Sequence, residues 1–198
     1  MATMRVPGSL ARIAAVVLGF IATGPLEASA DDAGRPALHD ATVLHDPEGR
    51  SVTLASFPGR WQLVYFGYTS CPEFCSIMLI DMAGLLDELG PLADRLQPLF
   101  VTIDPERDTP ELLKSYAAAI DQRILALTGS DAEIRRWAAL FGVGYSKAAT
   151  GKAAADYTID HSVFLSVVDP SGDPVARLTH EQGPRRMAEI FRQLLQRE

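Results

Sequence analysis

The sequence lacks any excess of basic residues, because 18 Lys and Arg stand against 25 Asp and Glu and give a net charge of −7. A protein that binds nucleic acid normally carries a basic surface, so nucleic acid is excluded as a partner. Internal repeats and long low-complexity runs are also missing. The length of 198 residues, with 47% hydrophobic and 22% charged residues, is typical of one globular domain of ordinary size.

The N-terminal segment lacks both a long apolar run and a cysteine at its end. Residues 1–12 contain Arg5 and Arg12 and no acidic residue. Residues 13–22 are apolar, and residues 28–30 read Ala-Ser-Ala. This pattern predicts a signal peptide over residues 1–30 and export to the periplasm. The apolar run is too short to span a bilayer comfortably. An uncleaved anchor that holds the domain at the membrane, facing the periplasm, or a mitochondrial presequence is the alternative.

The rest of the chain predicts a flexible N-terminus over residues 31–40 and one α/β domain over residues 41–198. Alternating strands and helices imply parallel strands with helices on both faces, and a final antiparallel hairpin makes the sheet mixed. This is the order of a thioredoxin-like fold, a mixed central sheet flanked by helices, with an added N-terminal β-hairpin. The predicted elements are a hairpin at 41–57, a strand at 62–68, a helix from Pro72 to Leu89, a strand at 98–104, a helix at 109–120, a strand at 124–129, a helix at 130–142, a loop or loose hairpin at 143–157, a hairpin at 162–179 and a helix at 183–195.

The chain has only two cysteines, Cys71 and Cys75. Cys71 follows a predicted strand at the start of a helix, where unpaired N–H groups favour an anion and a lowered thiol pKa is expected. Cys75 would follow one helical turn later, so the two sulfurs can close a disulfide or hold one metal ion. A structural disulfide is the ordinary expectation in an exported protein, although so short a loop stabilises little. The spacing alone leaves disulfide, redox pair and metal site open.

Two thiolates do not complete a metal site. A soft pair of sulfurs suits Cu(I) or Zn, and imidazole suits both copper and zinc. His161 precedes the strand of hairpin 162–179, and would lie beside the cysteine helix if that strand were a parallel neighbour of strand 62–68. Taken alone, His161 is more often a structural histidine. The other histidines are predicted at the surface: His39, His45 and His180. Two methionines fit the apolar stripe of the cysteine helix and are expected in the core: Met78 and Met82.

Three segments together resemble the Sco/SenC family, in that family's order: FGYTSCPEFC (66–75), VTIDPERDTPE (101–111) and DYTIDHS (156–162). The resemblance covers roughly residues 40–197. It implies a thioredoxin-like fold that binds one copper ion, Cu(I) or Cu(II), through Cys71, Cys75 and His161. It also implies a role in assembling the dinuclear copper centre of cytochrome c oxidase subunit II, as copper carrier, thiol reductant or both. The implied partners are copper and subunit II or another copper protein, associated with the membrane.

The same resemblance assigns Asp104 to a position close to the metal, where a carboxylate orients the imidazole or adjusts the charge of the site. On the residues alone, Asp104 is equally well interpreted as a polar strand end that stabilises the following turn. Two positions depart from the family pattern, because Ser70 stands where His is common and Ser76 where Pro is common. Neither position is a ligand, so copper binding is expected to survive. An oxidase assembly factor and a specialised paralogue both remain open.

The competing hypothesis is a periplasmic thiol–disulfide oxidoreductase or redox sensor without obligatory copper transfer. Cys71 would attack and Cys75 would resolve, because Cys71 is nearer the start of the helix and the solvent. His161 separates the two hypotheses, since redox chemistry needs only the cysteines. A peroxidase is not favoured, because Tyr68 occupies the position three residues before Cys71 where a Thr or Ser is needed.

Overall fold

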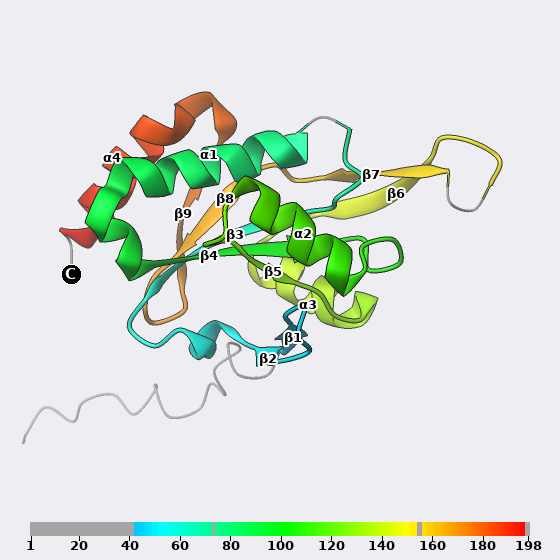
Figure 1. Cartoon of the computed structure of the whole chain (residues 1–198), viewed down its shortest axis with the longest axis horizontal. Helices are drawn as coiled ribbons and strands as arrows, with labels where there is room; N and C mark the ends of the chain where they lie inside the picture. The colour runs from blue at the N-terminus through cyan, green and yellow to red at the C-terminus, as the bar shows by residue number, and fades with distance from the viewer. Residues whose placement is uncertain (1–41, 73, 154–155, 197–198) are drawn as a thin grey trace, which may run out of the picture. The chain divides into compact units, whose positions relative to one another are not determined.

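The computed structural model describes residues 42–72, 74–153 and 156–196 (Figure 1). The predicted signal peptide and the predicted flexible N-terminus lie outside the described residues. Among the residues that are described, no helix is both long and apolar enough to cross a membrane.

The centre of the domain is a five-stranded mixed sheet with the strand order β5-β4-β3-β8-β9. Its strands are β3 (Trp61–Gly67), β4 (Leu96–Thr102), β5 (Leu125–Leu127), β8 (Leu165–Val168) and β9 (Pro174–Leu178). The first three are parallel to one another, whereas β8 is antiparallel to both β3 and β9. Every residue of β3 is buried, as expected for a strand covered on both faces. The prediction of an α/β fold with a mixed central sheet is therefore confirmed.

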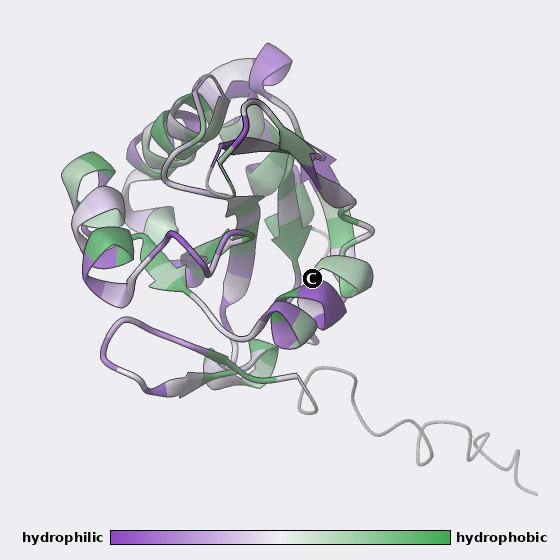
Figure 2. Ribbon diagram, turned by 90° about the vertical axis from the view of Figure 1, so that its right-hand side faces the viewer, coloured by the Kyte–Doolittle hydropathy of each residue, from purple (hydrophilic) through white to green (hydrophobic). Residues whose placement is uncertain are grey.

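Helices cover both faces of this sheet. They are α1 (Phe74–Leu89), α2 (Pro110–Ile120), α3 (Asp131–Leu140) and α4 (Gly183–Leu195). Figure 1 shows α1 and α4 together on one side of the sheet and α3 on the other. Successive residues of a strand point to opposite faces. Tyr65 accordingly lies toward α1, while Phe66 packs on Phe141 at the end of α3, with ring centroids 5.5 Å apart. Several of the central strands are coloured as apolar in Figure 2.

Local sequence signals explain where two of the helices begin and end. The Thr109 side chain accepts a hydrogen bond from the Leu112 amide, and Pro110 occupies the first helical position of α2. Ser130 and Glu133 form the predicted capping box of α3. Gly142 follows α3 with a φ of 63°, a conformation that favours glycine.

Two hairpins lie outside the central sheet. The predicted N-terminal hairpin consists of β1 (Leu44–His45) and β2 (Ser51–Val52), and His45 exchanges backbone hydrogen bonds with Thr128. The second hairpin is β6 (Tyr145–Ala149) with β7 (Tyr157–His161), and it extends beyond the central sheet in Figure 1. Of the loop and the loose hairpin considered for residues 143–157, the structure shows the hairpin, whose second strand runs beyond that segment to His161. Three short 3₁₀ helices complete the described elements: η1 (Leu54–Ser56), η2 (Gly90–Arg95) and η3 (His180–Gln182).

The strand that follows His161 is not the parallel neighbour of β3 that the sequence argument required. It begins later, at Leu165, and runs antiparallel, with Tyr65 opposite Leu165 and Gln62 opposite Val168. An antiparallel neighbour places its first residue beside the last residues of β3. His161 therefore still approaches the cysteine segment, through a strand direction opposite to the predicted one.

Candidate metal centre

Cys71, Cys75 and His161 converge at the carboxyl end of β3. One ligand atom from each residue lies within 4.8 Å of the other two. Cys71 lies in the loop between β3 and α1, Cys75 is in the first turn of α1, and His161 is the last residue of β7. Within the described part of the chain, this is the one group of three or more Cys, His, Asp or Glu residues that could hold a metal ion.

Cys71 belongs to a turn and not to the helix, which corrects the predicted spacing of one helical turn. The Cys71 amide donates to the Tyr68 carbonyl at 3.3 Å, and α1 begins only at Phe74. This turn leaves Cys71 partly exposed, whereas Cys75 is fully buried, and the two cysteines do not form a disulfide in this structure. The pair is therefore asymmetric, with one cysteine partly exposed and the other enclosed.

Cys75 is enclosed by the end of β3. Burial raises the pKa of the Cys75 thiol to about 12, and the adjacent Cys71 adds to this rise. A Cβ atom on Gly67 would lie 2.9 Å from the Cys75 sulfur and 2.9 Å from the Tyr65 ring. Only a glycine leaves room for the sulfur at this point of the strand.

Replacing Gly67 with alanine is therefore expected to lower the free energy of unfolding by about 1–3 kcal/mol, because the new methyl group overpacks the space beside Cys75. Chemical denaturation of the reduced protein measures this loss. Gly144→Ala is the matched control, since a Cβ there meets nothing within 4 Å and its effect should be small. Equal losses from the two substitutions would show that the close packing around Cys75 is not the cause.

His161 presents an unprotonated nitrogen to the sulfurs. Its Nδ1 lies 2.9 Å from the Ser162 carbonyl oxygen, which can only accept, so Nδ1 carries the proton. Nε2 lies 3.5 Å from the Cys75 sulfur, and in this tautomer its lone pair accepts a hydrogen bond from the Cys75 thiol. Burial lowers the pKa of His161, which keeps the ring neutral at pH 7. The imidazole is thus already in the state that a metal requires.

Asp104 lies near the site but does not orient the imidazole through a described contact. Its carboxylate is fully buried, accepts a hydrogen bond from the Tyr157 hydroxyl at 2.6 Å and is ion-paired with Arg107. The Asp104 backbone carbonyl accepts from the amides of Arg107 and Asp108 and so closes the turn after β4. The His161 ring is oriented instead by its hydrogen bond from Nδ1 to the Ser162 carbonyl. These contacts favour the turn-stabilising interpretation of Asp104.

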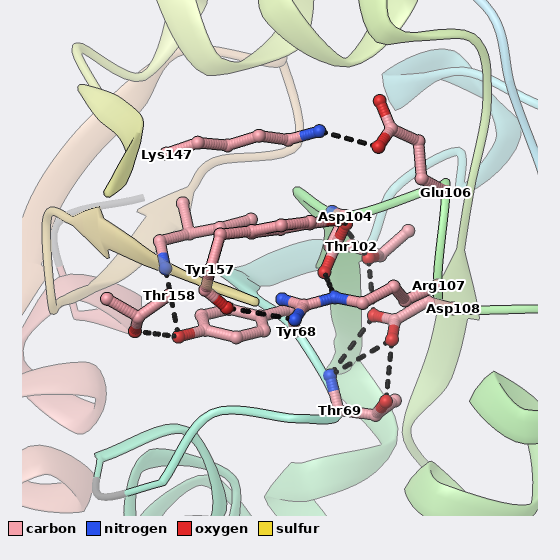
Figure 3. A network of polar contacts seen from close by, with 11 residues as sticks. Tyr68, Thr69, Thr102, Asp104, Glu106, Arg107, Asp108, Lys147, Tyr157 and Thr158 are labelled. Atoms are coloured by element: carbon pink, nitrogen blue, oxygen red, sulfur yellow. Dashed lines mark hydrogen bonds and ion pairs between the residues drawn. The ribbon is translucent and has the colours of Figure 1, made fainter. Parts of the chain in front are cut away.

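A second buried carboxylate, Asp108, ties the cysteine loop to the central sheet. It accepts from the Thr69 amide at 3.1 Å, from the Thr69 hydroxyl at 2.6 Å and from the Thr102 hydroxyl at 2.6 Å (Figure 3). Thr69 precedes Cys71 by two residues, and Thr102 is the last residue of β4. The position of Cys71 is therefore coupled to the end of β4 through one side chain.

Arg107 and two tyrosines connect the turn after β4 to the β6–β7 hairpin, which carries His161. The Arg107 guanidinium lies 3.8 Å from the Tyr157 ring centroid and 5.6 Å from that of Tyr68, and its Nη1 donates to the Tyr157 carbonyl at 2.9 Å. The Tyr68 hydroxyl lies 2.9 Å from the Thr158 hydroxyl and accepts from the Ile159 amide at 3.2 Å (Figure 3). Both ligand-bearing segments are thus fixed to the turn that follows β4.

Apart from Asp104, the sequence argument missed the residues of this polar network, although all of them lie in the three quoted segments. Arg107 and Asp108 lie in the turn that follows Asp104, and the sequence pattern assigned no role to either. The prediction that Met78 and Met82 lie in the core is confirmed. Ser70 and Ser76, the two departures from the family pattern, are exposed. His180 is exposed as predicted and pairs with Asp81 at 2.6 Å. His45, predicted at the surface, is half-buried because its strand pairs with Thr128, and His39 lies outside the described residues.

The fold and the site together define a class: a thioredoxin-like protein in which two thiols and a neutral imidazole meet at the end of a central strand. The profile of the SCO1/SenC family matches residues 30–196, and the chain belongs to this family. Protein sco1 of Schizosaccharomyces pombe is 38% identical over 141 residues, which make up 70% of this chain and 54% of that protein. The chain spans about half the length of its fungal, plant and human relatives.

Two solved structures show the same architecture. Bradyrhizobium japonicum ScoI, determined with copper bound, is 32% identical and superposes with a TM-score of 0.69 over 77% of this chain and 96% of that one. BsSco, described as having a disulfide switch and as a member of the Sco family of cytochrome c oxidase assembly proteins, is 25% identical, with a TM-score of 0.58 over 76% of this chain and 89% of that one.

Proposed function

We propose that the reduced chain binds one cuprous ion through Cys71, Cys75 and His161 and carries it to the dinuclear copper centre of cytochrome c oxidase subunit II. The observation that carries this proposal is the convergence of two sulfurs and an imidazole nitrogen within 4.8 Å. Thiolates are soft ligands that select Cu(I), and imidazole also suits copper. The copper bound to B. japonicum ScoI and the description of BsSco's family as oxidase assembly proteins support the same role.

Copper is cargo in this role, and the asymmetry of the two sulfurs provides a route for its release. Cys71 is partly exposed, whereas Cys75 is buried. A thiolate of the recipient can therefore approach the ion from the side of Cys71 and form a new sulfur–copper bond as the Cys71–copper bond breaks. Cys75 and His161 hold the ion until a second recipient ligand replaces them. Binding requires both cysteines as thiolates, so loading releases protons.

The direct test is a Cu(I) titration in competition with a chromogenic cuprous chelator. Wild type is expected to bind one equivalent, and the Cys71→Ser/Cys75→Ser double variant none. His161→Ala should bind at least about a hundredfold more weakly, because loss of an outer hydrogen-bond partner alone already costs about 10–100-fold. His180→Ala is the control, since His180 is exposed and pairs with Asp81. One tight copper in all four proteins would overturn the assignment.

Thiol–disulfide exchange is the second candidate function, favoured by two cysteines that form no disulfide here and whose sulfurs lie within 4.8 Å of each other. In this reaction the Cys71 thiolate attacks a disulfide of the partner, and Cys75 then displaces the partner's sulfur. After the exchange this protein carries a Cys71–Cys75 disulfide. The partner's disulfide has gained two electrons and two protons and is a dithiol. His161→Ala separates the functions, because it should retain this exchange while losing copper affinity.

We also propose that the chain acts in the periplasm, with a membrane-associated copper protein as its partner. The basic start, short apolar run and Ala-Ser-Ala sequence support export and cleavage after Ala30. Cell fractionation with N-terminal sequencing tests this, and a mature chain that begins at Asp31 is the expected result. An uncleaved chain in the membrane fraction would support the anchored alternative.

A further inference from the structure

Tyr68 contacts both of the segments that carry the proposed copper ligands. It follows β3 directly, and its side chain is almost completely buried. Its backbone carbonyl accepts a hydrogen bond from the Cys71 amide at 3.3 Å. Its hydroxyl reaches β7, where it accepts from the Ile159 amide at 3.2 Å and lies 2.9 Å from the Thr158 hydroxyl (Figure 3). One residue thus joins the cysteine loop to the strand that ends at His161.

The β6–β7 hairpin depends on such side-chain contacts for its attachment to the rest of the domain. Its two strands pair with each other and form a sheet of their own, so among the described strands none joins β7 to the central sheet. Arg107 and Asp104 hold Tyr157, the first residue of β7. Tyr68 instead holds Ile159, close to the end of the strand. Of these attachments, the one made by Tyr68 lies nearest to His161 in the chain.

The attachment at Ile159 also fixes the direction in which His161 points. Residues i and i+2 of a strand lie on the same face, so His161 shares the face of Ile159, which is buried. A slip of β7 by one residue would turn the imidazole to the opposite face. The Tyr68 ring adds a second contact, because it packs edge-on against the imidazole with centroids 6.0 Å apart. Hydroxyl and ring together hold the imidazole where its Nε2 lies 3.5 Å from the Cys75 sulfur.

We propose that Tyr68 is a positioning residue that holds His161 in the ligating position before copper arrives. This inference rests on the proposed copper site. A ligand that is already in place loses little conformational freedom on binding, so preorganisation raises the affinity without any new contact to the ion. Without the hydroxyl, the Ile159 amide loses its acceptor and the imidazole is held less firmly. Tyr68 acts through His161 and is not itself a ligand.

The test is Tyr68→Phe, which removes the hydroxyl and keeps the ring. The variant should bind Cu(I) roughly tenfold more weakly than wild type, within the range of about 10–100-fold for the loss of a partner that orients a ligand. A titration against a chromogenic cuprous chelator measures this loss. In the metal-free variant, the Ile159 amide should exchange its hydrogen with solvent faster than in wild type, because its acceptor is gone. Hydrogen exchange followed by NMR measures this second effect without copper.

A double-mutant cycle with His161→Ala separates positioning from a general structural role. Because Tyr68 acts through His161, adding Tyr68→Phe to His161→Ala should lower the affinity for Cu(I) no further. A hydroxyl that only stabilised the fold would lower the affinity by the same factor in both backgrounds.

Tyr145→Phe is the matched control. Tyr145 lies directly opposite His161 in the β6–β7 pairing, but its ring packs on Arg135, 4.9 Å from the guanidinium carbon. This control should leave the copper affinity and the exchange of the Ile159 amide unchanged. Wild-type affinity in Tyr68→Phe, or an equal loss in both backgrounds of the cycle, would overturn the inference while the copper site stands. If wild type binds no copper through its cysteines, or if His161→Ala binds it as tightly as wild type, the proposed function fails and the inference falls with it.

Discussion

Between pH 6 and pH 8, the affinity of the reduced protein for Cu(I) is expected to rise about a hundredfold or more. Each proton displaced on binding changes the apparent affinity by about tenfold per pH unit. Burial raises the pKa of Cys75 to about 12, so Cys75 carries a proton throughout this range and copper must displace it. Any proton displaced from Cys71 makes the dependence steeper. Affinity therefore increases with pH and does not level off near neutrality.

His161 does not contribute to this rise above pH 7. Burial lowers its pKa from the ordinary value of 6.5, so the ring is neutral there and offers Nε2 without losing a proton. At lower pH protonation of the ring competes with copper and steepens the fall. Competition titrations at several pH values, with a chelator of known pH dependence, measure the slope. An affinity that stays constant from pH 6 to pH 8 would contradict a site built on a buried Cys75.

Replacing Arg107 with alanine is expected to lower the free energy of unfolding by about 3–5 kcal/mol, the range for removing one partner of a buried ion pair. The Asp104 carboxylate is fully buried, and Arg107 is its charged partner. The substitution also removes the cation between the Tyr68 and Tyr157 rings and the hydrogen bond to the Tyr157 carbonyl. Urea denaturation of the metal-free protein measures the loss.

Arg135→Ala is the matched control for Arg107→Ala. Arg135 also pairs with an aspartate, Asp131, and also lies over a tyrosine ring, but both members of the pair are exposed. Exposed ion pairs of this kind on a helix contribute about 0.3–0.5 kcal/mol to the free energy of unfolding. Adding Asp104→Asn to Arg107→Ala should recover part of the loss, because the uncompensated charge disappears. The explanation by a buried charge is wrong if Asp104→Asn restores none of the lost free energy of unfolding and the two arginine variants lose equal amounts.

The elements of the fold that could be predicted from the sequence are those with local causes. Thr109-Pro110 and the Ser130–Glu133 box define helix starts within one turn of chain, and the apolar run of β3 is confined to seven residues. The assignment of Cys71, Cys75 and His161 as one group came from the resemblance of three segments. Neither source depends on how distant strands pair.

The remaining features depend on contacts between residues far apart in the chain. The antiparallel direction of β8 follows from packing in the whole sheet, and the argument from His161 assumed the opposite direction. The partners of Asp104 and Asp108 lie on three different segments, so they cannot be predicted from the residues of a single turn.

X-ray absorption at the copper edge tests the central claim most directly. Reduced protein loaded with one Cu(I) should show two sulfur ligands and one nitrogen ligand, and His161→Ala should lose the nitrogen while keeping both sulfurs. His180→Ala should give the wild-type spectrum. A copper environment without sulfur, or one that is unchanged in His161→Ala, would contradict the three-residue site.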